Sequence, residues 1–145
     1  MRRLGKFFKL SGGEKRRFVE AAVWLTVFRV AVSCVPFRVI AGLLGRERGE
    51  TAVAFPDPAG RGEVLAVARA LKVMGRSLPW ESTCLVKAAA GKRMLSCRSI
   101  PATLYLGVAR DDVNAVAAHA WLRSGDVILT GAEERDRYTV ICTFA

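Results

Sequence analysis

The chain has 145 residues, of which 52% are hydrophobic, and its formal net charge is +10. This length suits one domain with its own core, and the hydrophobic fraction argues against a mainly disordered chain. The four cysteines are scattered and there is one histidine, so the composition favours neither a disulfide framework nor a Cys/His zinc site. We therefore expect reduced thiols in a cytoplasmic protein.

The positive charge is concentrated in residues 1–50, which hold 11 Lys and Arg against 4 Asp and Glu. Such a segment can face an acidic peptide, anionic lipid or nucleic acid, or can be a solvated surface. Nucleic acid ranks last, because basic and aromatic residues do not interleave as on a strand-binding surface. Two arginines and a proline interrupt the apolar stretch 21–44, which predicts a buried or interfacial helix and not a membrane span.

The first third of the chain is expected to be helical. Residues 14–35 are rich in apolar side chains and lack Gly and Pro, which predicts a long helix. Pro36 should kink or restart it, and a second, short helix should follow over residues 37–44. The segment 47–62 contains several Gly and Pro residues and is expected to be a loop.

Two further helices are expected before the chain changes character. Apolar residues at helical spacing predict a helix over residues 63–74, with Gly75 ending it. Another helix should begin near Cys84, because Ser82 or Thr83 supplies a natural N-cap there.

The last third shows the alternation of apolar and polar residues that is typical of strands. Four strands are expected, over residues 101–108, 116–123, 126–130 and 138–144. Helices first and strands second predict an α+β fold with an antiparallel sheet. We expect residues 1–50 to form a basic helical segment that packs on a core formed by residues 51–145.

Cys84, at the predicted start of a helix, is the candidate nucleophile. The unpaired N–H groups and the positive end of the helix dipole favour a thiolate at this position. The same N–H groups could hold an oxyanion during acyl transfer. The alternative is a small core residue, which is what we expect of Cys34 and Cys142.

His119 is the only histidine in the chain and is flanked by small residues. Imidazole is the natural base for a cysteine near neutral pH. Considered alone, His119 would be read as a structural histidine with a satisfied hydrogen bond. Together with Cys84 at a helix start, we interpret it as the base of a nucleophile–base pair.

The third member of the constellation is the acceptor that orients the base. Asp126 is the nearest acid after His119 in sequence and is our choice. A tight turn at residues 124–125 would, however, place Thr130 and not Asp126 opposite His119. A backbone carbonyl therefore stays open as an alternative. So do three acids of the next loop: Glu133, Glu134 and Asp136.

Taken together, these residues resemble a known family. The run PWESTCLVKAAAGKRMLSCRSIPATLYLGVAR, followed by AAHAWLRSGDVILTG and RYTVICTF, resembles the leader peptidases of lasso-peptide biosynthesis. That family belongs to the transglutaminase-like superfamily of papain-type enzymes. The resemblance covers most of the chain and implies a transglutaminase-like fold in which Cys84 and His119 are catalytic. In many members the triad aspartate lies about where Thr130 and Gly131 stand, and this sequence has no acid there.

The resemblance implies a concrete function. The protein would remove the leader from a ribosomally made lasso precursor peptide through a Cys84 acyl-enzyme, without a metal or a tightly bound cofactor. A separate small leader-recognition protein would be its partner, and an ATP-dependent cyclase would receive the cleaved core. The alternatives are a transglutaminase-like acyl transferase and a non-catalytic scaffold in a peptide-maturation complex. Peripheral membrane contact through the basic N-terminus is a further open alternative.

Overall fold

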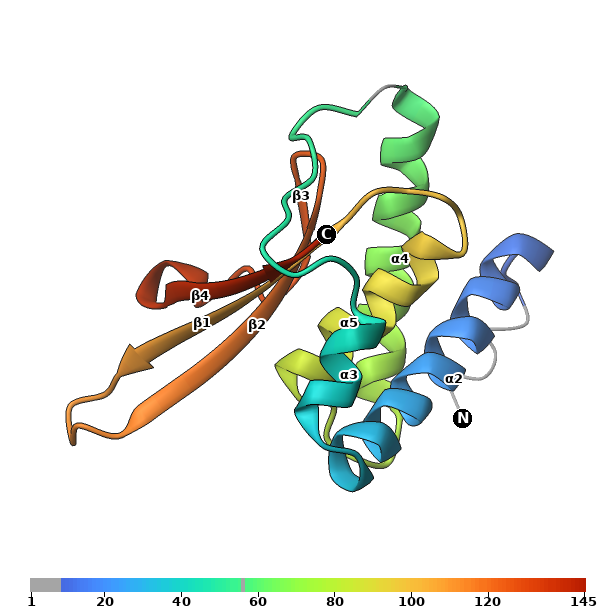
Figure 1. Ribbon diagram of the computed structural model, residues 1–145. Helices are drawn as coiled ribbons and strands as arrows, with labels where there is room; N and C mark the ends of the chain where they lie inside the picture. Colours follow the sequence, from blue (N-terminus) through green and yellow to red (C-terminus); the bar gives the residue numbers. More distant parts are fainter. Residues whose placement is uncertain (1–8, 56) are drawn as a thin grey trace.

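The computed structural model describes residues 9–55 and 57–145. In these residues four α-helices come first and a four-stranded antiparallel sheet follows, which confirms the α+β class (Figure 1). The helices are α2 (Gly12–Cys34), α3 (Phe37–Leu43), α4 (Pro58–Ser77) and α5 (Cys84–Ser96). The strands are β1 (Thr103–Arg110), β2 (Val116–Ser124), β3 (Val127–Thr130) and β4 (Thr139–Phe144), and a short 3-10 helix, η1 (Arg135–Arg137), precedes β4.

The first two helices follow the pattern of the sequence. Ser11 caps α2 in a capping box: the Glu14 N–H donates to Ser11 Oγ at 3.3 Å, and the Ser11 N–H donates to Glu14 Oε2 at 3.1 Å. Val35 is the C-cap of α2, and Pro36 then separates it from α3. The basic residues at positions 1–8 lie outside the described residues.

Helix α4 begins earlier than the sequence pattern predicts. It starts at Pro58 instead of residue 63 and continues past Gly75. Asp57 is the N-cap, because the Gly60 N–H donates to Asp57 Oδ1 at 2.7 Å, and Pro58 needs no hydrogen bond at the first helical position. Burial of one face of α4 outweighs the cost of Gly75, about 1 kcal/mol relative to alanine.

The core lies between the helices and one face of the sheet. Helices α4 and α5 pack on the sheet, and α2 packs on α4 and α5 (Figure 1). Contact between α5 and β2 is close: a Cβ atom at Gly91 would lie 2.7 Å from Leu122 Cδ2. The largest fully buried side chains include Leu25, Leu71, Met94, Leu95, Leu104 and Leu122. Helix α2 thus shares the core with later elements, and the division at residue 50 stays a prediction.

The sheet has the strand order β3-β2-β1-β4. Residues 125–126 form the turn between β2 and β3, so that Ser124 pairs with Val127. A bulge then shifts the register, and Thr130 lies opposite Leu122. The expectation that Thr130 lies opposite His119 is therefore wrong, because the turn falls one residue later and the bulge adds a further shift.

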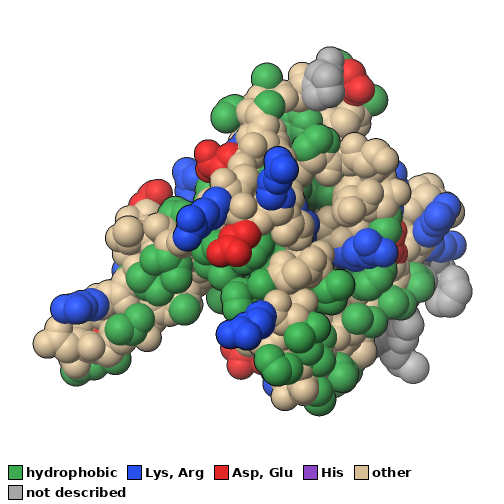
Figure 2. Space-filling view, in the orientation of Figure 1, with side chains coloured by type: hydrophobic (Ala, Val, Ile, Leu, Met, Phe, Trp, Pro, Cys, Tyr) green, Lys and Arg blue, Asp and Glu red, His purple; other side chains and the backbone are tan. Residues whose placement is uncertain are grey.

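The helical layer leaves apolar side chains at its surface. Among the described helices, none is both long enough and apolar enough to cross a membrane. Hydrophobic side chains nevertheless gather around the lower end of this layer, where α3 lies (Figure 2). The exposed ones on α2 and α3 are Val19, Val23, Val27, Val30, Phe37, Val39 and Leu43.

Candidate active site

Cys84 is the first residue of α5, which confirms its expected place at a helix start. Thr83 is the N-cap, and its Oγ1 accepts a hydrogen bond from the Val86 N–H at 3.5 Å. The N–H groups of Cys84 and Leu85 belong to the first turn, where a helix offers them no acceptor. Cys84 is half-buried and packs against the hydrophobic core. A half-buried thiol at a helix N-terminus has the setting that acyl transfer needs.

The loop that leads into α5 carries unpartnered polar atoms. Trp80 Nε1 and Ser82 Oγ are buried and have no hydrogen-bond partner among the described residues. Buried polar atoms without partners cost free energy, and a bound ligand is one source of the missing partner. Both residues stand within four positions of Cys84 in the sequence.

His119 lies on β2 in a cluster of aromatic side chains. Its ring centroid is 5.0 Å from that of Tyr138 and 5.9 Å from that of Trp121. Gly107 of β1 pairs with His119 and makes room for the cluster, because a Cβ atom there would lie 2.9 Å from both Trp121 Cζ3 and Tyr138 Cβ. Gly107, Trp121 and Tyr138 lie in the sequence runs that carry the family resemblance, but no role beside His119 was predicted for them.

Gly131 supplies the acceptor for His119. The Nε2 atom of His119 lies 2.9 Å from the carbonyl oxygen of Gly131. Because a carbonyl only accepts, a neutral ring must carry its proton on Nε2, which leaves Nδ1 free to take one. Gly131 has φ of +74°, and a Cβ atom there would lie 2.6 Å from the Ala120 carbonyl oxygen. A backbone carbonyl, one of the alternatives for the third member, thus lies at hydrogen-bond distance from His119.

No hydrogen bond between Cys84 and His119 brings the candidate nucleophile and base together among the described residues. Ala120 and Leu122 of β2 belong to the core beside α5, and side chains alternate along a strand. His119 and Trp121 therefore point to the opposite face of the sheet. In this conformation the nucleophile–base pair is not assembled.

Asp126 lies in the turn between β2 and β3, away from the histidine. Its carboxylate oxygens accept from Arg61, with 3.3 Å between Arg61 Nε and Asp126 Oδ1. Both side chains are about half exposed. The structure thus brings Asp126 to Arg61 and not to His119, and its role as the third residue stays a prediction.

The remaining cysteines have different surroundings. Cys34, expected in the core, is exposed because it is the last residue of α2, and Cys97 is exposed at the end of α5. Cys142 is half-buried, with its Sγ 3.7 Å from Glu47 Oε1. Burial, together with the Glu47 carboxylate, raises the pKa of the Cys142 thiol.

No group of three or more His, Cys, Asp and Glu side chains in the described residues could hold a metal ion.

Comparison of the sequence with known protein families identifies the superfamily of the chain. No curated protein and no solved structure matches the chain. The sequence pattern of the transglutaminase-like superfamily, however, matches residues 22–143, a span that contains both Cys84 and His119. The chain therefore belongs to the transglutaminase-like superfamily.

Proposed function

We propose that the protein is a cysteine peptidase that removes the leader from a ribosomally made lasso precursor peptide. The observation that carries the proposal is Cys84 at the first position of α5, inside a domain of a superfamily that includes thiol peptidases and acyl transferases. The order and spacing of the PW-x-x-x-CL, LGV and HAW elements support the lasso assignment, since together they resemble the leader peptidases of that pathway.

The proposed reaction has two steps. The Cys84 thiolate attacks the carbonyl carbon at the leader–core junction, and N–H groups at the start of α5 hold the oxyanion. The C–N bond breaks as His119 protonates the departing core amine, which leaves the leader on Cys84 as a thioester. Water then attacks the thioester, His119 takes up its proton, and the leader acid leaves the regenerated thiolate.

This mechanism requires a rearrangement of His119. The ring must come within about 3.2 Å of the Cys84 thiol in the reacting complex. In the free chain it is held by Gly131 on the opposite face of the sheet. Binding of the precursor and the leader-recognition protein would supply the free energy for this change, so dependence on the partner is part of the proposal.

The test is mass spectrometry of a precursor peptide from the same gene neighbourhood. It is incubated with this protein and the neighbouring small leader-binding protein. We expect one cut with wild type, and none with Cys84→Ala or His119→Ala. Cys97→Ala is the matched control, because Cys97 is exposed and lies at the other end of the same helix. Cleavage by Cys84→Ala at the wild-type rate would rule out the peptidase.

A second arm of that assay separates hydrolysis from acyl transfer. Both reactions share the Cys84 thioester and differ in the nucleophile that resolves it. Addition of methylamine should leave a peptidase product mainly as the free leader acid. A leader that carries methylamine at its new carboxyl end in preference to water would favour the acyl transferase instead.

A further inference from the structure

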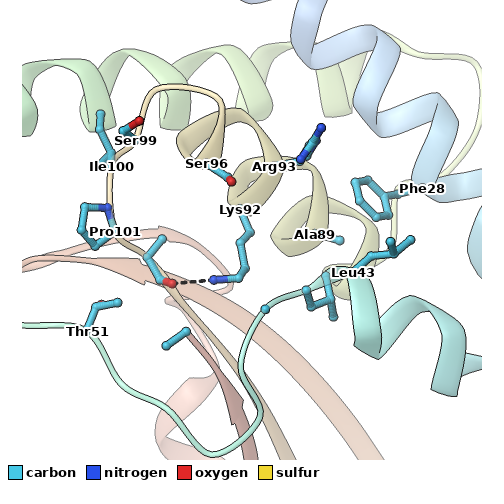
Figure 3. A pocket seen from close by; sticks show the side chains of 14 residues that line it. Phe28, Leu43, Thr51, Ala89, Lys92, Arg93, Ser96, Ser99, Ile100 and Pro101 are labelled. Carbon is cyan, nitrogen blue, oxygen red and sulfur yellow. Dashed lines mark hydrogen bonds between the residues drawn. The ribbon is translucent and has the colours of Figure 1, made fainter.

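Helix α2 is apolar on the face that it turns to solvent as well as on the face that it buries. The buried face carries Phe18, Ala21, Leu25 and Phe28, of which Phe28 points toward α5 (Figure 3). Four valines on the outward face are 46–56% exposed: Val19, Val23, Val27 and Val30. Their spacing of three or four residues puts them in one row along the helix, which we call the valine stripe. A helix that faces water on one side normally carries polar residues there, so we expect the stripe to be covered.

Helix α3 adds to this apolar surface beyond the end of α2. Phe37, Val39 and Leu43 are exposed on it, and Leu43 is 73% exposed. Only Val35 and Pro36 separate the two helices, and Figure 2 shows hydrophobic side chains gathered around this end of the helical layer. Single exposed apolar side chains are common on soluble proteins, whereas a group of them on two consecutive helices is typical of an interaction surface.

The charges that accompany this surface on α2 and α3 are positive. Arg16 lies one turn before the valine stripe, and Arg38 is the second residue of α3. Both are exposed, and neither forms an ion pair with a described residue. The two acids of α2, Glu14 and Glu20, are paired with arginines of α4 and of the segment after α5, and α3 contains no acid. The surface therefore offers cations without free carboxylates.

This combination of charge and side-chain type favours one kind of cover. A second copy of the chain would bring the same cations to the surface, and like charges repel. The centre of a specific protein interface is usually rich in aromatic, Met and Arg side chains, which the valine stripe lacks. An anionic lipid surface needs no such anchors, because its headgroups attract cations and its acyl chains accept aliphatic side chains from a helix that lies in the interface.

We propose that α2 and α3 dock the protein on the surface of an anionic phospholipid bilayer. Helix α2 lies parallel to the membrane plane, with the valine stripe at the boundary between headgroups and acyl chains. Arg16 and Arg38 extend to the lipid phosphates, while their aliphatic stems stay beside the apolar side chains. The surface includes neither Cys84 nor His119, so this inference does not rest on the proposed function.

The test is co-sedimentation of the full chain with sucrose-loaded vesicles at about 0.1 M NaCl. One set of vesicles contains phosphatidylglycerol and phosphatidylcholine in equal parts, and the other contains phosphatidylcholine alone. We expect saturable binding to the anionic vesicles and at least about tenfold weaker binding to the neutral ones, because each basic residue near an anionic surface adds to the attraction. Raising the salt to about 0.5 M should weaken the binding, since salt screens these charges. Absence of binding to the anionic vesicles would overturn the proposal.

Two double variants with the same change of charge separate the valine stripe from a general attraction to a basic protein. Val23→Asp with Val27→Asp places two carboxylates on the stripe and should weaken binding to the anionic vesicles at least about tenfold. Val73→Asp with Val113→Asp is the matched control, at exposed positions of α4 and of the β1–β2 turn, and should weaken it less than about threefold. Far-ultraviolet circular dichroism checks that both variants fold. Val23→Ser with Val27→Ser should also weaken binding, without any change of charge, and replaces the aspartate pair if that pair unfolds.

Other covers of the surface give different results in the same variants. Equal vesicle binding by the two aspartate pairs would leave only the attraction of the basic chain and would overturn the proposal. So would a dimer that forms without vesicles and that the stripe variant abolishes in sedimentation velocity, because a second copy would then be the cover. If the stripe variant loses the leader-recognition protein and keeps its vesicle binding, the cover is a protein, and the proposal is likewise overturned.

Discussion

His119 Nε2 and the carbonyl oxygen of Gly131 lie 2.9 Å apart, so a backbone group orients the only imidazole of the chain. An aspartate would stabilise the imidazolium by its charge as well as orient the ring, whereas a carbonyl offers only a dipole. The contact still selects one tautomer of the neutral ring.

The first prediction concerns the third residue. Asp126→Asn should change precursor cleavage less than about twofold, because Asp126 contacts Arg61 and not His119. It should also change the free energy of unfolding by less than about 1 kcal/mol, since the pair with Arg61 is exposed. His119→Ala should lower the cleavage rate by about 100-fold or more. Equal losses in the two variants, measured by mass spectrometry, would instead support Asp126 as the orienting acid.

The second prediction concerns the space beside His119. Gly107→Val should destabilise the fold by roughly 1–3 kcal/mol, because its side chain would collide with Trp121 and Tyr138. Near-ultraviolet circular dichroism should report the displaced aromatic rings. The matched control is Gly42→Ala in α3, where no heavy atom lies within 4 Å of the new Cβ, and this change should stabilise slightly. An unchanged aromatic signal in Gly107→Val would contradict the packing described.

The third prediction concerns an ion-pair cluster that joins three parts of the helical layer. Glu63 of α4 accepts from Arg17 of α2 at 2.9 Å, and from Arg98, just after α5, at 2.7 Å. The hydrogen bond from Arg17 and that from Arg98 lower the pKa of Glu63 to about 2, from its ordinary 4.5. The ionised carboxylate is therefore favoured more strongly in the folded chain than in the unfolded one.

The pH dependence follows from this lowered pKa. The stabilisation is fully present above pH 4.5 and is lost as the pH falls toward 2. Glu63→Gln should cost roughly 1–2 kcal/mol at pH 7 in urea unfolding, and the gap to wild type should narrow by pH 3. Glu81→Gln, at an exposed position, should match wild type throughout. A gap that stays constant between pH 7 and pH 3 would contradict the assigned role of the charge.

The fourth prediction concerns the cap in front of Cys84. Thr83→Ala removes the acceptor of the Val86 N–H and should lower the free energy of unfolding by about 1 kcal/mol. Thr83→Ser keeps the hydroxyl and should lose much less. Urea unfolding of the two variants measures the difference. If alanine and serine behave alike, the cap does not stabilise the start of α5.

Local signals in the sequence predicted much of the fold. Pro36 separated the first two helices, Thr83 set the start of α5, and alternation located the strands because these effects act over a few residues. The start of α4 was missed because Pro58 can begin a helix as well as mark a loop, and only the Asp57 cap decides between them.

Long-range geometry explains what could not be predicted at the site. The bulge in the pairing of β2 with β3 changes which residues of the two strands lie opposite each other. The alternation of apolar and polar residues in the sequence does not predict such a bulge. The sequence shows a glycine at position 131. The contact between its carbonyl oxygen and His119, however, depends on how the loop after β3 folds. Likewise, the face of the sheet on which His119 lies follows from how β2 packs on α5.

The most direct test of Cys84 as the nucleophile is its rate of alkylation by iodoacetamide near neutral pH, resolved by peptide mass mapping. Cys34 and Cys97 are exposed and Cys84 is half-buried, so accessibility alone would make alkylation of Cys84 the slowest of the three. The account predicts the reverse, with Cys84 reacting at least about tenfold faster because its sulfur stands at the N-terminus of α5, the positive end of the helix dipole. Cys84 reacting no faster than Cys34 and Cys97, with precursor and partner absent or present, would contradict it.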